Sequence, residues 1–258
     1  MAGWPGKTTG VLFIHGAGLG SWIWREMVEE LAAPCLLADF PHAENGGDRT
    51  DLSLDDYVEA IRLQAEEWIA PRFVIVAHSI GGLIGLKLAE RMADRVAGFI
   101  AVGAAIPKNG RGAFLSALPA PNRWIMGAIL RKGNTLPPEK AIRNGLCSGL
   151  DEAKADVVVG RYARESVRLF TDKLGSAIPN NLPKCYVQLA EDKELGPGLQ
   201  KKMIRHLAPQ TVKTLQTGHL PMLADPAGLR RVIEDFLASL PGEDGRAGRA
   251  GAGADAGA

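Results

Sequence analysis

Cysteine is scarce in this chain, and its three copies are Cys35, Cys147 and Cys185. They are odd in number, widely spaced and outside any CxxC pair, which argues against a disulfide framework and a cysteine zinc site. A reducing compartment fits this usage, so we expect a cytoplasmic protein. We expect neither a bound metal nor a cofactor.

An excess of charge of either sign is also missing, because 30 Lys and Arg face 29 Asp and Glu. No overall basic field points to nucleic acid or to an anionic membrane. Residues 1–10 carry no apolar signal-peptide core, and no uninterrupted apolar stretch approaches the roughly 20 residues that span a bilayer. We therefore expect a soluble protein whose partner is a small molecule, with no nucleic acid and no membrane; the oligomeric state stays open.

Short apolar runs alternate with amphipathic stretches along most of the 258 residues. This alternation predicts one α/β domain over 1–240, with a mostly parallel sheet and helices on both faces. The expected strands are 10–15, 35–39, 72–77, 96–102, 184–189 and 211–215. The expected helices are 21–33 with Ser21 as its cap, one opened by Ser53, 80–92, 198–207 and 227–240.

The rhythm breaks between about 103 and 181, where prolines interrupt short helical stretches and no comparable strand occurs. We predict an inserted helical lid over the carboxyl edge of the sheet, where open α/β folds bind ligands. Its apolar side chains either line a pocket or pack the lid down: Leu115, Leu118, Trp124, Ile125, Met126 and Ile129. Its cations either attract an anionic substrate or form a solvated face: Lys108, Arg111, Arg123, Arg131 and Lys132. Residues 241–258, mostly Gly and Ala, should be a disordered tail.

The stretch 73–83, FVIVAHSIGGL, organises the rest of the chain. A buried strand runs straight into a helix, with Ser79 on the turn between them, as in a nucleophile elbow. Such a turn is sharp and crowded, so small residues are needed two positions before and after the serine, and Ala77 and Gly81 stand there. The simpler alternative is that Ser79 only ends a strand and caps a helix.

A serine nucleophile needs a base, and the base needs an acceptor that fixes its tautomer. Strand 184–189 runs into Glu191, Asp192 and Lys193, and strand 211–215 runs into Gly218 and His219. The order Ser79, Asp192, His219 is the order of this kind of fold. For the acid we favour Asp192 over Glu191, with Glu194 a weaker choice.

The other four histidines are weaker candidates for the base. His15 ends a strand, His42 lies in a loop, His78 should point away from Ser79 along its strand, and His206 falls late on a helix.

Backbone N–H groups must also stabilise the oxyanion that forms when an ester carbonyl is attacked. The small residues after His15 and the start of the helix after Ser79 offer two such groups, and we expect Ala17 and Ile80 to supply them. Gly16 belongs to the same loop.

These motifs resemble the α/β-hydrolase superfamily, over about residues 11–240. They are most similar to its branch of plant methylesterases, hydroxynitrile lyases and bacterial esterase relatives. The residues that carry the likeness are HGA at 15–17, AHSIGG at 77–82, EDK at 191–193, Gln200 and GHLPM at 218–222. The resemblance implies a Ser79–His219–Asp192 triad, an Ala17 and Ile80 oxyanion hole, and an acyl-enzyme intermediate.

Lyases of this branch place a threonine where Gly16 stands and a lysine where Leu220 stands, so the likeness implies an esterase. We expect His15, Gly16 and Leu220 beside the substrate. The function expected is therefore hydrolysis of a small carboxylic ester. A thioesterase or cyclising hydrolase is the alternative, and a lyase or a non-catalytic receptor is less favoured.

Overall fold

The computed structural model describes residues 9–42, 49–132, 135–175 and 177–241, and its centre is a six-stranded sheet. The strand order is β2-β1-β3-β4-β5-β6, and all neighbouring strands are parallel. This confirms the predicted α/β fold. The strands are β1 (Gly10–Ile14), β2 (Cys35–Ala38), β3 (Phe73–His78), β4 (Val96–Val102), β5 (Lys184–Leu189) and β6 (Thr211–Leu215).

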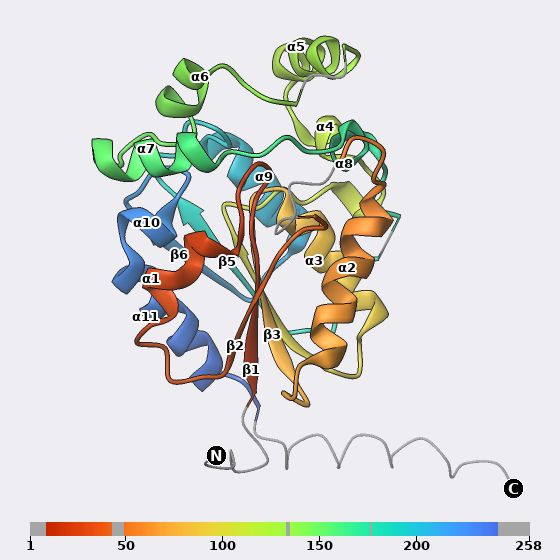
Figure 1. Cartoon of the computed structure of the whole chain (residues 1–258). Coiled ribbons are helices and arrows are strands. Elements are labelled where there is room, and N and C mark those ends of the chain that lie inside the picture. The colour runs from red at the N-terminus through yellow and green to blue at the C-terminus, as the bar shows by residue number, and fades with distance from the viewer. Residues whose placement is uncertain (1–8, 43–48, 133–134, 176, 242–258) are drawn as a thin grey trace, which may run out of the picture.

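Helices cover both faces of the sheet (Figure 1). Because side chains alternate along a strand, Val11 and Phe13 of β1 belong to one apolar cluster, and Leu12 and Ile14 to the other. Helices α2 (Leu54–Glu67), α3 (Gly81–Arg91) and α9 (Pro197–Leu207) contribute to the cluster of Leu12. Helices α1 (Arg25–Val28) and α11 (Pro226–Ala238) contribute to the other. A strand buried on both faces must be apolar throughout, which explains the continuous runs in the sequence.

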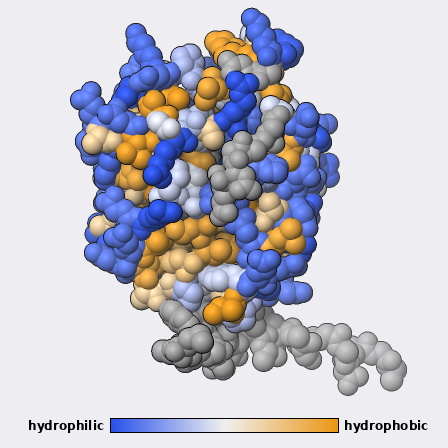
Figure 2. Space-filling model, viewed as in Figure 1, coloured by the Kyte–Doolittle hydropathy of each residue, from blue (hydrophilic) through white to orange (hydrophobic). Residues whose placement is uncertain are grey.

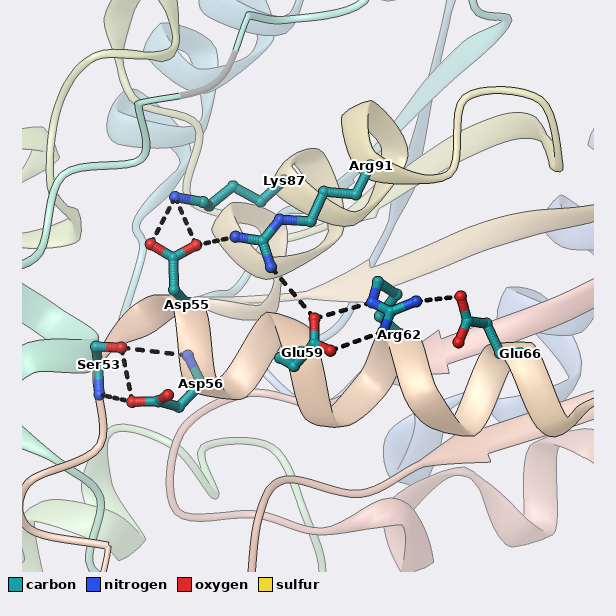
Figure 3. A network of polar contacts seen from close by, with 8 residues as sticks. All are labelled: Ser53, Asp55, Asp56, Glu59, Arg62, Glu66, Lys87 and Arg91. Carbon is teal, nitrogen blue, oxygen red and sulfur yellow. Dashed lines mark hydrogen bonds and ion pairs between the residues drawn. The ribbon is translucent and has the colours of Figure 1, made fainter.

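Helix α2 begins as predicted at Ser53, through a capping box with Asp56. Its exposed side carries charges that reach α3 (Figure 3). The Asp55 carboxylate lies 3.0 Å from the Lys87 ammonium and also pairs with Arg91. Because Asp55 is 54% exposed, solvent screens these ion pairs.

The predicted helix over 21–33 is wrong in length and in its cap. The structure has a 3₁₀ turn, η1 (Ser21–Trp24), followed by the single turn of α1. The backbone N–H and the hydroxyl of Ser21 both donate to the Asp39 carboxylate, at 2.7 Å each, so this side chain caps no helix. After α1, the Leu31 N–H bonds to the Val28 carbonyl in a tighter turn that leads the chain back towards β2.

Residues 103–183, which we call the helical insertion, join β4 to β5. Its described residues form helices and turns without a strand. Figure 1 shows α4 to α8 above the carboxyl edge of the sheet, where the lid was expected. Its elements are η2 (Lys108–Gly110), α4 (Phe114–Ala117), α5 (Ala120–Leu130), α6 (Glu139–Asn144), α7 (Glu152–Arg161) and α8 (Val167–Thr171).

Two other expectations concern the chain ends and membranes. The predicted tail falls on 242–258, outside the residues that the structure describes. Across the described part of the chain, no helix combines the length and apolarity that a bilayer crossing requires. Helix α10 (Pro221–Ala224) completes the set of elements, between β6 and α11.

Candidate active site

Ser79 lies on the turn between β3 and α3 with a φ of 55°, a left-handed conformation that is strained for a side chain other than glycine. Its backbone is held in place on both sides. The Ser79 N–H donates to the Val102 carbonyl at 3.2 Å, and its own carbonyl accepts from the Ala105 N–H at 2.9 Å. A Cβ on Gly81 would lie 2.7 Å from the His15 carbonyl oxygen, so the crossing chains leave room only for glycine there.

The structure brings Ser79, His219 and Asp192 into one hydrogen-bonded chain. His219 Nδ1 lies 2.8 Å from Asp192 Oδ2, and its Nε2 lies 3.0 Å from Ser79 Oγ. Because an ionised carboxylate only accepts, Nδ1 carries the proton and the Nε2 lone pair faces the serine hydroxyl. This is the tautomer in which His219 can take a proton from Ser79.

The Asp192 carboxylate is buried and fixed from several directions. Its Oδ1 accepts from the backbone N–H groups of Glu194 and Leu195, at 2.8 and 2.9 Å. The Gln200 amide approaches Oδ2 at 3.3 Å. Burial would raise the pKa of Asp192, but the charge and hydrogen bond of His219 lower it, so the group stays ionised.

His219 is 2% exposed, and opposing effects set its basicity. Burial lowers its pKa, yet the Asp192 carboxylate, and more weakly Glu194, raise the pKa of His219 above its ordinary value. The carboxylates therefore stabilise the imidazolium that His219 becomes when it accepts a proton from Ser79.

The prediction that His78 points away from Ser79 is wrong. Its imidazole lies 4.7 Å from the ring of His219, and its Nε2 lies 2.8 Å from the His219 carbonyl oxygen. A carbonyl only accepts, so Nε2–H donates. Burial lowers the pKa of His78 to about 3, so the ring is neutral near pH 7. His78 therefore ties the strand before Ser79 to the loop that carries His219.

The loop after β1 passes close to Ser79. A Cβ on Gly16 would lie 3.0 Å from Ser79 Cβ, so this glycine allows the approach. Of the two predicted oxyanion donors, Ala17 lies in this loop and Ile80 directly follows the serine. In the described turns and loops, no backbone carbonyl accepts a hydrogen bond from either N–H.

Two of the expected substrate contacts lie deeper than expected. His15 is fully buried against Phe40 and has its Nδ1 2.8 Å from the Gly16 carbonyl oxygen. Leu220 is 1% exposed. His15 and Leu220 therefore pack beneath the loops of the site. Gly16 is buried as well, but it lies directly beside Ser79, and the next residue, Ala17, is partly exposed.

The structure also contains a buried cluster that the sequence analysis missed. Glu165, 2% exposed in the helical insertion, accepts from the Gly18 N–H at 3.1 Å and from Arg49 at 2.9 Å through one carboxylate oxygen. Its other oxygen accepts from the Tyr57 hydroxyl at 2.9 Å. Because 147 residues separate Gly18 from Glu165, no local pattern signals this contact.

The same segment of the insertion holds Gly18 a second time. The Ala163 N–H donates to the Gly18 carbonyl at 2.9 Å, and a Cβ on Gly18 would collide with the Tyr162 ring. Gly18 has a φ of +74°. Both backbone polar groups of Gly18 are thus fixed by the insertion, next to the residues expected to bind the oxyanion.

The remaining candidates are not in the chain of hydrogen bonds. Glu191 is exposed, and His42 lies in the loop after β2. His206 places its Nδ1 2.7 Å from the Ile106 carbonyl oxygen, away from Ser79. Glu194 lies near His219, and burial raises its pKa against the opposing charge of His219. Within the described ranges, no group of three His, Cys, Asp or Glu side chains is arranged to hold a metal ion.

Three features together point to one family of proteins. They are a parallel sheet with helices on both faces, a serine on a left-handed turn after the third strand, and a histidine after the last strand. The family model for the alpha/beta hydrolase family matches residues 11–232. The chain belongs to this family, as the resemblance in its sequence predicted.

Individual relatives agree with this assignment. The protein named "Putative methylesterase 14, chloroplastic" from Arabidopsis thaliana is 25% identical, over 89% of this chain and 72% of its own length. An extracellular alpha/beta-hydrolase from a Paenibacillus species superimposes with a TM-score of 0.78 at 16% identity, over 88% of this chain and 98% of that one. A methylesterase from Arabidopsis gives 0.71 at 17% identity, over 90% and 100%. At such identities the structural likeness shows the shared fold.

Proposed function

We propose that the protein hydrolyses a small carboxylic ester through a serine nucleophile and an acyl-enzyme intermediate. The observation that carries the proposal is the chain from Asp192 through His219 to Ser79, with hydrogen-bond distances of 2.8 and 3.0 Å. Each atom in that chain has the donor or acceptor character that proton transfer from Ser79 requires.

In the first half of the reaction, Ser79 Oγ attacks the ester carbonyl while His219 Nε2 accepts the hydroxyl proton. The Asp192 carboxylate stabilises the imidazolium, and the N–H groups of Ala17 and Ile80 stabilise the oxyanion. His219 then returns the proton to the leaving alcohol, and the acyl group stays on Ser79. In the second half, His219 takes a proton from water as the water oxygen attacks the acyl carbon. The acyl–oxygen bond to Ser79 then breaks, His219 returns the proton to Ser79 Oγ, and the acid leaves.

The choice of an ester rests on the relatives and on two residues. A curated relative is named as a methylesterase, as is one of the similar structures. Gly16 and Leu220 stand where the lyases of this branch have threonine and lysine, which disfavours the lyase reaction. The partner that we propose is thus a small ester, without a metal or a cofactor.

We assign the helical insertion the role of a lid on the same domain. It lies above the carboxyl edge of the sheet, and its Glu165 and Ala163 bind Gly18 beside the site. Closure and substrate choice would then act on the oxyanion loop directly.

The first test is labelling with a fluorophosphonate, which reacts rapidly only with a base-activated serine. We expect one adduct, located on Ser79 by peptide mass spectrometry, and its loss in His219→Ala and in Ser79→Ala. The control is Ser166→Ala, which removes another buried serine hydroxyl far from His219 in the sequence. A folded wild-type protein that forms no adduct would refute the serine mechanism and favour a ligand-binding receptor.

The second test separates the ester from the thioester. A panel of methyl esters and acyl thioesters with matched acyl groups is compared by kcat/KM. We expect oxygen esters to be preferred. A thioester preference of more than about a hundredfold, roughly 3 kcal/mol in transition-state binding, would instead assign the same machinery to a thioesterase.

A further inference from the structure

Helix α5 carries an apolar face that no described part of the chain covers. Trp124, Ile125 and Ile129 are 69%, 63% and 43% exposed, and Ala128 is exposed between them. The spacing i, i+1, i+4 and i+5 places these four side chains on one side of a helix. Single exposed apolar residues are ordinary, but a contiguous face of them indicates a binding surface.

The opposite side of α5 is already in use. Gly127 and Leu130 are buried there, and α5 packs on α4. The helix is therefore apolar on its covered side and on its uncovered side, so the exposed face is not needed to pack the insertion down. Nor does it line an inner pocket, because these side chains are open to solvent. Figure 1 shows α5 as the outermost helix above the sheet, and Figure 2 shows apolar surface there beside strongly hydrophilic surface.

The charged residues in the stretch of sequence that carries this face have one sign. Arg131 and Lys132 are exposed directly after α5, and Arg123 is half-buried near its start. The sequence contains no Asp or Glu between Asp94 and Glu139, so nothing acidic in that stretch offsets these cations. An apolar face with a tryptophan and flanking cations is the pattern of a helix that lies in an anionic lipid interface.

We propose that the α5 face, Trp124, Ile125, Ala128 and Ile129 with Arg131 and Lys132, docks on an anionic lipid surface. A second copy of the chain fits this face poorly, because a two-fold contact between two α5 helices would bring their cations together. The balance of charge over the whole sequence led us to expect no membrane partner. Local charge and exposure, which decide interfacial binding, point the other way. Since α5 lies on the side of the sheet that carries Ser79, docking would turn the active-site side toward the lipid.

The test is cosedimentation of the full chain with phosphatidylcholine vesicles, with and without phosphatidylglycerol. We expect binding to the mixed vesicles only, and weaker binding as salt rises. Ile125→Ser with Ile129→Ser should lower the partition coefficient about tenfold or more. Arg131→Gln with Lys132→Gln should lower it about fivefold per cation removed.

Matched variants control for general effects. Ile69→Ser removes an isoleucine that is 82% exposed between α2 and β3, outside the face, and should change nothing. Lys201→Gln with Lys202→Gln removes two exposed cations from α9 and should have little effect. Ser79→Ala should bind like the wild type, so this test does not depend on the proposed function.

Three results would overturn the proposal. One is no binding to mixed vesicles, and another is binding that the Ile69 control weakens as much as the α5 variant. The third is a wild-type dimer in size-exclusion chromatography that the α5 variant converts to a monomer without any vesicle binding, since a second copy would then cover the face.

Discussion

Two regions of the helical insertion, the segment around Glu165 and helix α5, differ in what they bury and what they expose. The segment around Glu165 buries charged and polar groups, and each finds a partner on the glycine loop, on Arg49 or on Tyr57. Helix α5 does the reverse, because it exposes Trp124 and Ile125 to solvent. The first arrangement costs free energy unless its partners are all in place, and the second costs free energy until something covers it.

In the site, Asp192, His219 and Ser79 are held by partners within the chain, whereas the outer face of α5 is exposed to solvent. Around Ser79, buried hydrogen bonds hold each side chain in one orientation, so the geometry can be prepared before substrate arrives. At α5, no described residue of the chain covers the outer face. The insertion therefore joins a pre-organised site to a surface that is open for a partner.

The largest effect is expected where the prepared geometry is broken directly. Asp192→Asn removes the negative charge and lets His219 adopt the wrong tautomer, so kcat for ester hydrolysis should fall about 10⁴-fold, as for the equivalent change in other serine hydrolases. Steady-state kinetics measures this. The control is Glu191→Gln, one residue earlier and exposed, which should stay within a few-fold of the wild type. Equal losses in both variants would contradict the assignment of Asp192.

The next effect concerns the buried side of the insertion. Glu165→Ala leaves Arg49, 7% exposed, without its carboxylate and frees the Gly18 N–H, so the free energy of unfolding should fall by about 3–5 kcal/mol. Asp55→Ala is the matched change in an exposed cluster and should cost about 1 kcal/mol or less. Urea unfolding of both variants makes the comparison. Similar values would mean that the Glu165 cluster is not stabilising.

A third prediction concerns acid. Burial lowers the pKa of His15 to about 4 and of His78 to about 3. Below pH 6.5 these histidines therefore bind protons in the unfolded chain but not in the folded protein. The free energy of unfolding falls as pH falls. Each histidine should remove about 1.5 kcal/mol between pH 6.5 and about 5.

Urea unfolding at the two pH values measures the loss. His78→Asn should reduce the loss of unfolding free energy between these pH values by the amount expected for one histidine, about 1.5 kcal/mol. His42→Asn, in an exposed loop position with a φ of 59°, should leave it unchanged. An unchanged slope in the His78 variant would show that this ring accepts a proton in the folded protein.

The smallest expected effect is on the pH dependence of activity. The pKa of His219 is raised above 6.5, so its base form is lost as pH falls through a value above 6.5, and kcat/KM should drop about tenfold per pH unit below it. Glu194→Gln removes one negative charge near the ring and should move this limb to lower pH. A limb that stays in place would exclude Glu194 from the electrostatics of His219.

The local structure of the site could be predicted because its signals are contiguous. The run 73–83 encodes a strand, a turn and a helix within eleven residues, and the small residue Gly81 marks a crossing chain. The apolar strands and their alternation with helices likewise identified a parallel sheet. The helix at 21–33 was misjudged because apolar spacing alone did not show that Ser21 is engaged by Asp39.

The sequence by itself determined the fold, the turn at Ser79 and the candidates Asp192 and His219, since each depends on residues close together in the chain. Only the tertiary structure decided which groups meet. It showed His78 reaching the His219 carbonyl, Glu165 clamping Gly18, and Trp124 exposed on α5. Those facts depend on packing between distant segments, because burial and long-range hydrogen bonds are properties of the assembled chain.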